Sequence, residues 1–429
     1  MQISANNPDR KTWLHVDKNS DFPIQNIPFG VFLTRDDIIT IGTRIGDTAI
    51  DLGALHQLGY FSDIPLTDDI FLQDTLNDFI ADGRKTWRAV RNKIADIFDA
   101  DNDTLKNNKQ HKEIVLFRLD EIEMQLPIQI GDYTDFYSSI EHASNVGTLF
   151  RDEEHALLPN WLHIPIGYHG RSSSIIPSGI PIHRPQGQTL PPDVEEPVFG
   201  PSKFVDFELE MAFITTDAND FGEPIPVNEA EEYIFGLVLF NDWSARDIQS
   251  WEFVPFGPFL SKNFASSMSP WIVTLDALEP FRVQGPKPIK EQMPYLRTKG
   301  KKSFDINLEV AIQPKTAKET IVCRSNFKHM YWNMSQQLAH HTINGCPVNS
   351  GDLMGSGTLS GPTPESLGSM LELTWRGSKT LTLKDGTERT YINDNDTVIM
   401  RGYCENDGTR IGFGEVKNEL LPIFKPNKK

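Results

Sequence analysis

Apolar and polar residues follow a regular pattern along the first hundred residues. The apolar runs 31–34 and 38–42 flank a turn-like polar tripeptide, Arg35-Asp36-Asp37, and predict a β-hairpin within a small barrel or sheet. From 68 to 98 the apolar residues recur at helical spacing, and Gly83 predicts a break between two helices.

The periodicity fails in the polar stretch 101–110, which is typical of an exposed connection. A domain boundary is therefore expected soon after it. This divides the chain into an N-terminal domain, 1–125, and a larger C-terminal domain, 126–429.

Beyond residue 125 the pattern is mostly that of strands, so the fold class is mainly β with α+β elements. A continuous apolar run, 235–240, predicts a buried strand. Further short strands are expected over 306–312, 370–375 and 396–400. One helix is predicted from Asn326 to Ile343, ended by Asn344-Gly345. The proline-rich stretch 176–197 is expected to be a surface excursion.

Two acidic residues, Glu208 and Glu210, interrupt the apolar run 207–213. In a strand, side chains two residues apart share a face, so both carboxylates point to one spot. If protein covers that face, it holds either an acid pair of raised pKa or a cation. For an isolated pair of this kind, a half-exposed strand whose acids face water is the simpler interpretation.

Two further acids favour the cation. Asp242 ends the predicted buried strand, and Asp135 lies in the polar and aromatic stretch 132–139. Singly, either could cap a helix. Four converging carboxylates suit a hard divalent cation with oxygen ligands, Mg²⁺ or Ca²⁺, better than zinc.

Positive side chains follow the same strand. Arg246 and Gln249 are three residues apart on one predicted helical face directly after Asp242, and Lys262 lies among aromatic and small residues. All three could instead be surface groups. Together with a divalent ion, the two cations would bring the charge of four carboxylates close to zero, which permits burial.

His142 is the candidate base, because its ordinary pKa near 6.5 suits removal of a proton from water. Glu372, which alternates with Leu371 and Leu373, could orient it. A structural histidine and a salt-bridged framework acid are the competing interpretations. In the glycine-rich loop 351–361, which lacks the lysine of a phosphate loop, the Thr358 hydroxyl could approach a substrate carboxylate.

The 429-residue chain carries 59 acidic and 41 basic residues, a net charge of −18, which argues against nucleic acid or an anionic membrane as partner. No apolar run spans a bilayer, and the polar start lacks the order of a signal peptide, so a cytoplasmic protein is expected. The three cysteines have no disulfide or zinc spacing.

Long ordered motifs resemble the fumarylacetoacetate hydrolase family. They are DYTDFYSS (132–139), LPNWLHIPIGYHGR (158–171), FELEMAF (207–213), NDWSARDIQSWEF (241–253), GPFLSKNF (257–264), SNFKHMYWNMSQQLAHHTINGC (325–346) and GSMLELTW (368–375). The resemblance implies a small SH3-like N-terminal barrel, a larger C-terminal mixed β-sandwich or roll, and a homodimer. It also implies hydrolysis of a carbon–carbon bond in the diketo acid 4-fumarylacetoacetate to fumarate and acetoacetate, the last step of tyrosine and phenylalanine catabolism.

The resemblance further implies residue roles. The metal would be held by Asp135, Glu208, Glu210 and Asp242, with Lys262 and Ser266 close around it. His142, supported by Glu372, would be the base, and the oxyanion would be stabilised by Arg246, Gln249 and Lys262. Substrate contacts would come from Tyr137, Arg151, Tyr168, Gln249, Phe253 and Thr358. The family commonly has Tyr and Thr where Phe253 and Ser266 stand.

Two other hypotheses remain at this stage. A related enzyme of the superfamily, such as an acylpyruvate hydrolase, decarboxylase or hydratase, would share the acid cluster and differ in its pocket. A non-catalytic scaffold with a structural ion would need neither His142 nor Glu372, so their presence speaks against it.

Overall fold

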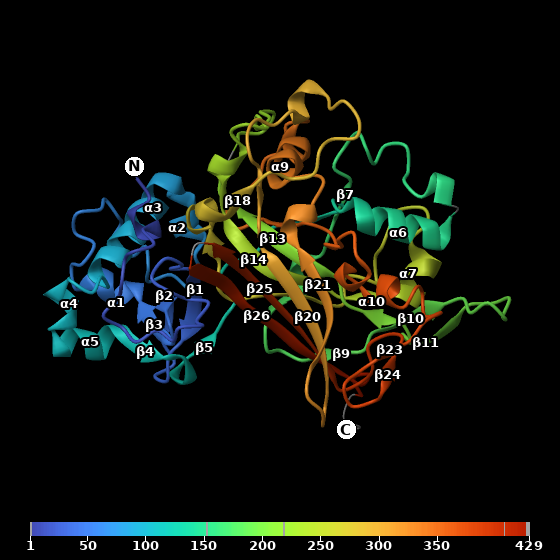
Figure 1. The fold of residues 1–429 in the computed structure, drawn as a ribbon, viewed down its shortest axis with the longest axis horizontal. Helices are drawn as coiled ribbons and strands as arrows, with labels where there is room; N and C mark the ends of the chain where they lie inside the picture. The colour runs from blue at the N-terminus through green and yellow to red at the C-terminus, as the bar shows by residue number, and fades with distance from the viewer. Residues whose placement is uncertain (1, 152, 218, 407, 426–429) are drawn as a thin grey trace.

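The computed structural model describes residues 2–151, 153–217, 219–406 and 408–425. It is mainly β, with a small N-terminal sheet and a larger C-terminal region built on two sheets (Figure 1). The fold class predicted from the sequence is confirmed. In the described part of the chain, no helix is long and apolar enough to cross a membrane.

The N-terminal sheet is a five-stranded antiparallel half-barrel in the order β4-β3-β2-β1-β5. The predicted hairpin is β1 and β2, with Phe29 opposite Thr43. The strands are β1 Phe29–Leu33, β2 Ile39–Ile45, β3 Thr48–Asp51, β4 Leu116–Arg118 and β5 Glu123–Met124. The helices beside them are α1 Leu52–Gln57, α2 Asn77–Ala81, α3 Gly83–Ile97, α4 Asp103–Lys106 and α5 Lys109–Val115.

The larger sheet has the order β7-β6-β22-β13-β14-β16-β8, with β17 also paired to β14. Its strands are β6 Tyr133–Phe136, β7 Gly167–His169, β8 Ile175–Pro177, β13 Leu209–Thr215, β14 Ile234–Asp242, β16 Ser266–Met268, β17 Val273–Thr274 and β22 Leu353–Gly355. The second sheet has the order β21-β20-β25-β26-β9 and consists of β9 Ile182–His183, β20 Asn307–Pro314, β21 Thr320–Asn326, β25 Asp396–Asn406 and β26 Thr409–Leu421.

Strand β14 is buried on both faces, which explains its continuous apolar run. Leu237 and Leu239 pack in one core with Val398 and Met400 of the second sheet. Val238 and Phe240, on the opposite face, pack in a second core with the N-terminal helices and strands. The large sheet is therefore the middle layer, between the N-terminal region and the second sheet.

Short pairs and helices complete the fold. The pairs are β10 Gln186–Thr189 with β11 Val198–Pro201, β12 Val205–Asp206 with β15 Ser244–Ala245, β18 Arg282–Val283 with β19 Ser303–Phe304, and β23 Leu381–Thr382 with β24 Glu388–Arg389. The helices are α6 Ile140–Phe150, α7 Arg246–Glu252, α8 Leu275–Leu278, α9 Met334–Thr342 and α10 Met370–Leu373.

Four local predictions were wrong in whole or in part. The residues from Thr320 to Asn326 form β21, so the predicted helix begins only at Met334. The predicted strand over 370–375 is the helix α10, whose N-cap is Ser369. The expected connection over 101–110 contains α4 and the start of α5. The stretch 176–197 is not only a surface excursion, because part of β8 lies in it and pairs with β16 in the large sheet.

Candidate active site

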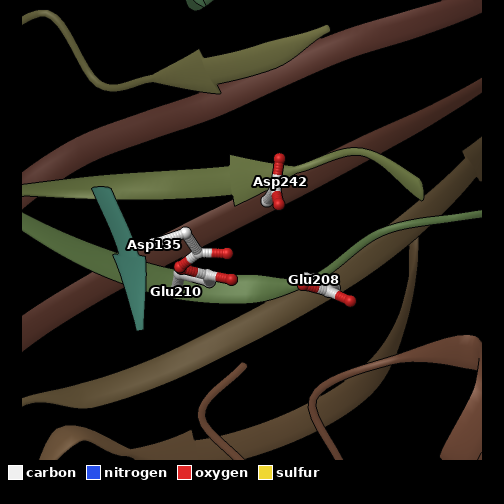
Figure 2. A group of neighbouring side chains, drawn as sticks. All are labelled: Asp135, Glu208, Glu210 and Asp242. Atoms are coloured by element: carbon white, nitrogen blue, oxygen red, sulfur yellow. The ribbon is translucent and has the colours of Figure 1, made fainter. Parts of the chain in front are cut away.

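The four predicted carboxylates meet within the large sheet, where they come from β6, from β14, and from β13 and the residue before it. Asp135, Glu208, Glu210 and Asp242 each offer an oxygen, and these oxygens lie within 4.8 Å of one another, all four residues being buried. Figure 2 shows Asp135 and Glu210 side by side, Asp242 at the end of β14 and Glu208 just before β13 begins. The simpler interpretation of exposed acids facing water was wrong.

The strand register explains this convergence. Leu209 pairs with Asn241, so Glu208 and Asp242 extend from neighbouring ends of β13 and β14. On the other side of β13, Gly355 pairs with Ala212 and also with Asp135 of the parallel strand β6. Side chains alternate along a strand, so Glu208 and Glu210 share a face. The strands β6, β13 and β14, with β22 between the first two, thus bring their acids to one place.

The cluster contains fixed positive charge as well. The ammonium of Lys262 lies 2.7 Å from Glu208 Oε2 and 2.8 Å from Asp242 Oδ2, and the Arg246 guanidinium lies 2.7 Å from Glu208 Oε1. The Ser266 hydroxyl donates to Asp242 Oδ1 at 2.8 Å. Arg246 also binds Asp206, a fifth buried carboxylate, so the charge balance predicted from four carboxylates was incomplete.

The positive charges of Lys262 and Arg246 act unequally on the four carboxylates. Burial raises the pKa of Glu208, but Lys262 and Arg246 outweigh it and hold that pKa below its ordinary value. Burial and the neighbouring acids raise the pKa of Asp135 and Glu210 well above the ordinary range. In the ranges that the structure describes, no ion pair within 4 Å joins Asp135 or Glu210 to a positive side chain, whereas Glu208 has two such partners.

A divalent cation fits this arrangement. Among the described residues, Asp135 Oδ1 and Glu210 Oε1 are buried and have no hydrogen-bond partner. Buried polar atoms normally have partners, so two carboxylate oxygens without one in the same cluster suit a divalent cation as their partner. Carboxylate oxygens are the ligands that Mg²⁺ and Ca²⁺ prefer.

His142 and Glu372 form a buried pair beside the cluster. His142 Nδ1 lies 2.7 Å from Glu372 Oε2. His142 lies in the first turn of α6, where the N-cap Ser139 accepts its backbone N–H, and Glu372 lies in α10. Burial raises the pKa of Glu372, but His142 and the hydrogen-bond donors around the carboxylate bring it below its ordinary value.

Three donors around Glu372 were absent from the sequence-based site. The Asn145 amide donates to Oε1 at 2.9 Å, and the hydroxyls of Ser360 and Ser369 donate to the carboxylate, each at 2.9 Å. A carboxylate with this many donors is held ionised and in a fixed orientation. Ser369 and Glu372 have the S-x-x-E spacing of a capping box, a signal that could have placed them at a helix start.

The predicted substrate contacts occupy varied positions. Tyr137 packs edge-on against His142 with ring centroids 5.4 Å apart, and the Tyr168 hydroxyl donates to Asp242 Oδ2 at 2.9 Å. Thr358 Oγ1 is buried, with no hydrogen-bond partner among the described residues. Phe253 is half-exposed at the end of α7.

Arg151 and Gln249 differ in their surroundings. Arg151 follows α6, and its guanidinium donates to the backbone carbonyls of His155 and Ala156. Gln249 accepts a hydrogen bond from Arg246 through Oε1 at 3.2 Å. This bond does not use the two N–H donors of Gln249 Nε2.

A mixed β fold with a buried carboxylate cluster beside a histidine–carboxylate pair defines a class of metal-dependent hydrolases, and the comparisons agree. Residues 133–421 match the fumarylacetoacetate hydrolase C-terminal family, and residues 25–127 match the fumarylacetoacetase N-terminal family. The chain belongs to the fumarylacetoacetate hydrolase family.

Close relatives cover nearly the whole chain. It is 48% identical to the fumarylacetoacetase of Rattus norvegicus over 417 residues, which are 97% of this chain and 100% of that protein. It is 49% identical to the fumarylacetoacetase of Dictyostelium discoideum over 421 residues, 97% of this chain and 99% of that protein. The solved fumarylacetoacetate hydrolase of psychrophilic Exiguobacterium antarcticum shares the fold at 16% identity and a TM-score of 0.51, covering 92% of this chain and 99% of that one.

Proposed function

We propose that this chain hydrolyses the carbon–carbon bond of 4-fumarylacetoacetate to fumarate and acetoacetate, the last step of tyrosine and phenylalanine catabolism. The observation that carries the proposal is the buried His142–Glu372 pair beside a four-carboxylate cluster. The full-length similarity to fumarylacetoacetases supports the choice of substrate.

The carboxylate cluster is proposed to hold Mg²⁺ or Ca²⁺ through Asp135, Glu208, Glu210 and Asp242. Lys262 and Ser266 hold Asp242 from the side, so they fix a ligand and are not expected to be ligands themselves. A divalent ion held there would supply Lewis acidity toward the carbonyl oxygens of the substrate.

The base follows from the hydrogen bond to Glu372. An ionised carboxylate only accepts hydrogen bonds, so the proton of neutral His142 lies on Nδ1 and Nε2 is free to take a proton from water. The water oxygen then bonds to the carbonyl carbon next to the fumaryl double bond. When the bond from this carbon to the adjacent methylene breaks, its electron pair leaves with acetoacetate as the enolate, which takes up a proton.

The tetrahedral oxyanion is proposed to lie against Arg246, Gln249 and Lys262. Within the described chain, Arg246 Nη2 is buried without a hydrogen-bond partner, so a donor is already present and desolvated. A preorganised donor of this kind is typically worth about 3 kcal/mol in the transition state.

The other substrate contacts remain proposals. The unpaired Thr358 hydroxyl suits a substrate carboxylate, and Tyr137 and Tyr168 lie against His142 and Asp242. Arg151 and Phe253 would contribute charge and an apolar ring from the ends of α6 and α7.

Purified protein incubated with fumarylacetoacetate should consume it, which is followed by loss of the diketone absorbance. His142→Ala should abolish this turnover while the divalent ion still binds, because the four carboxylates are untouched. The matched control is His340→Ala, which should keep turnover. His340 is a half-buried histidine on α9 that is hydrogen-bonded to Tyr295. Metal-loaded protein that leaves fumarylacetoacetate intact would contradict the proposal and favour a related enzyme of the family.

We further propose a homodimer, a cytoplasmic location and a division into two domains at residue 125. The homodimer is consistent with large exposed apolar side chains around Phe256, which is 98% exposed, and light scattering should give twice the mass of one chain. The cytoplasmic location is testable by cell fractionation. The division at residue 125 is supported by β5, which ends the N-terminal sheet at Met124, and by β6, which starts at Tyr133 in the large sheet.

A further inference from the structure

Asp206 connects two parts of the site that the proposed reaction uses separately. It ends the short strand β12 and is fully buried. Its Oδ2 accepts from Arg246 Nε at 2.8 Å and from the backbone N–H of Leu371 at 3.0 Å. Its Oδ1 accepts from the backbone N–H of Met370 at 2.7 Å. One carboxylate therefore holds both a guanidinium and the start of a helix.

The two groups serve different parts of the proposed chemistry. Arg246 begins α7 and offers its free Nη2 to the oxyanion. Met370 and Leu371 begin α10, whose third residue is Glu372, the partner of His142. In Figure 1, α6, α7 and α10 gather at the same end of the sheets.

We propose that Asp206 is a positioning residue. It fixes the spacing between the oxyanion donor Arg246 and the general base His142 with its partner Glu372. The inference rests on the proposed function. A change of about 1 Å in such a spacing costs roughly a hundredfold in rate. Asp206 touches neither substrate nor metal in this account and acts through the groups that it holds.

A cap for a four-residue helix does not by itself require a buried charge. Ser369 already caps α10 through its hydroxyl, and burial of a carboxylate is costly unless a positive group is paired with it. The charge is matched by Arg246, whose second bond goes to Glu208 at 2.7 Å. Without Asp206, Arg246 would have only Glu208 of the carboxylate cluster as an ionic partner. The backbone N–H groups of Met370 and Leu371 would lose their acceptor.

Asp206→Asn tests this directly. It keeps the shape of the side chain but replaces one carboxylate oxygen, which accepts hydrogen bonds, with an amide nitrogen, which only donates them. The expected result is a kcat roughly 10- to 100-fold lower, with KM and the affinity for Mg²⁺ changed less than about twofold. The matched control is Asp396→Asn. Asp396 is equally buried, accepts from Arg389 Nε and Nη2 at 2.7 and 2.9 Å and from the backbone N–H of Asn393 at 3.0 Å, and lies on β25.

The control should lose stability and keep kcat. If Asp206→Asn behaved like Asp396→Asn, with lower stability and unchanged kcat, the inference would be overturned. If the wild-type protein did not turn over fumarylacetoacetate, the proposed function would fail instead, so the two failures are distinguishable.

A second pair of variants covers the case in which Asp206→Asn does not fold. Met370→Pro removes one N–H donor at the first helical position, where proline is tolerated, and Met370→Ala makes a similar loss of buried side chain with the N–H retained. The inference predicts a kcat for Met370→Pro at least about tenfold below that of Met370→Ala. Equal kcat values would overturn it.

Discussion

At the scale of single residues, Gly355 leaves the space in which the carboxylates converge. A Cβ atom at this position would lie 2.8 Å from Asp135 Oδ1 and 3.1 Å from Glu210 Oε2. Both acids are held by strands on either side of β22 and cannot move away together. The residue is therefore part of the site, although it contributes no side chain.

Gly355→Ala should weaken divalent binding. Overpacking of this kind costs about 1–3 kcal/mol, so the dissociation constant for Mg²⁺ should rise at least about fivefold in calorimetric titration. Gly200→Ala is the control, since a Cβ there meets nothing within 4 Å. An unchanged affinity in Gly355→Ala would show that the metal does not use this end of the cluster.

The sequence predicted the clustered carboxylates better than it predicted the residues around them. Alternation places Glu208 and Glu210 on one face, and the same period of two includes Asp206, which lies just before the apolar run and carries no signal of its own. Ser360 and Asn145 could not be found in this way. They reach Glu372 only because α6, α10 and the loop after β22 pack together, and no local pattern encodes that contact.

At the scale of elements, long strands were predicted well and short helices poorly. Strands β14, β20 and β25 carry continuous or alternating apolar runs and appear where expected. The helix α10 has four residues, too few for a helical period to differ from an alternating one.

Capping residues would have corrected several of these errors. Asn333 and Gln336 form a capping box that marks the true start of α9. Asn102 and Asn108 accept backbone N–H groups at the starts of α4 and α5, in the stretch interpreted as a connection. Polar residues that resemble a loop were in fact helix starts.

At the scale of the whole molecule, the N-terminal region is fixed to the larger one by charge as well as by apolar packing. Asp276 on α8 lies 3.1 Å from the Arg84 guanidinium and 2.5 Å from the Arg88 Nε on α3. The carboxylate is almost fully buried. Burial raises the pKa of Asp276, but Arg88 and Arg84 outweigh it and hold the pKa below its ordinary value. Nothing local in the sequence joins residues this far apart.

Asp276→Asn should lower the free energy of unfolding by about 2 kcal/mol at pH 7. Because the folded-state pKa is depressed, the contribution is complete above the ordinary pKa of 3.8 and is lost as the pH falls through the lower folded value. The stability difference from wild type should therefore shrink below about pH 4. Denaturant unfolding at several pH values measures it, with the exposed Asp9→Asn as control. A difference that stays constant into acid would contradict an ionised Asp276.

The most direct measurement is the turnover of fumarylacetoacetate by chelator-treated protein during titration with Mg²⁺ or Ca²⁺, with bound metal counted in the same samples. We expect turnover to disappear with the metal and to return in proportion to its binding, reaching a plateau near one ion per chain, since Asp135, Glu208, Glu210 and Asp242 form one cluster. Full turnover by protein shown to carry no divalent ion would contradict the account.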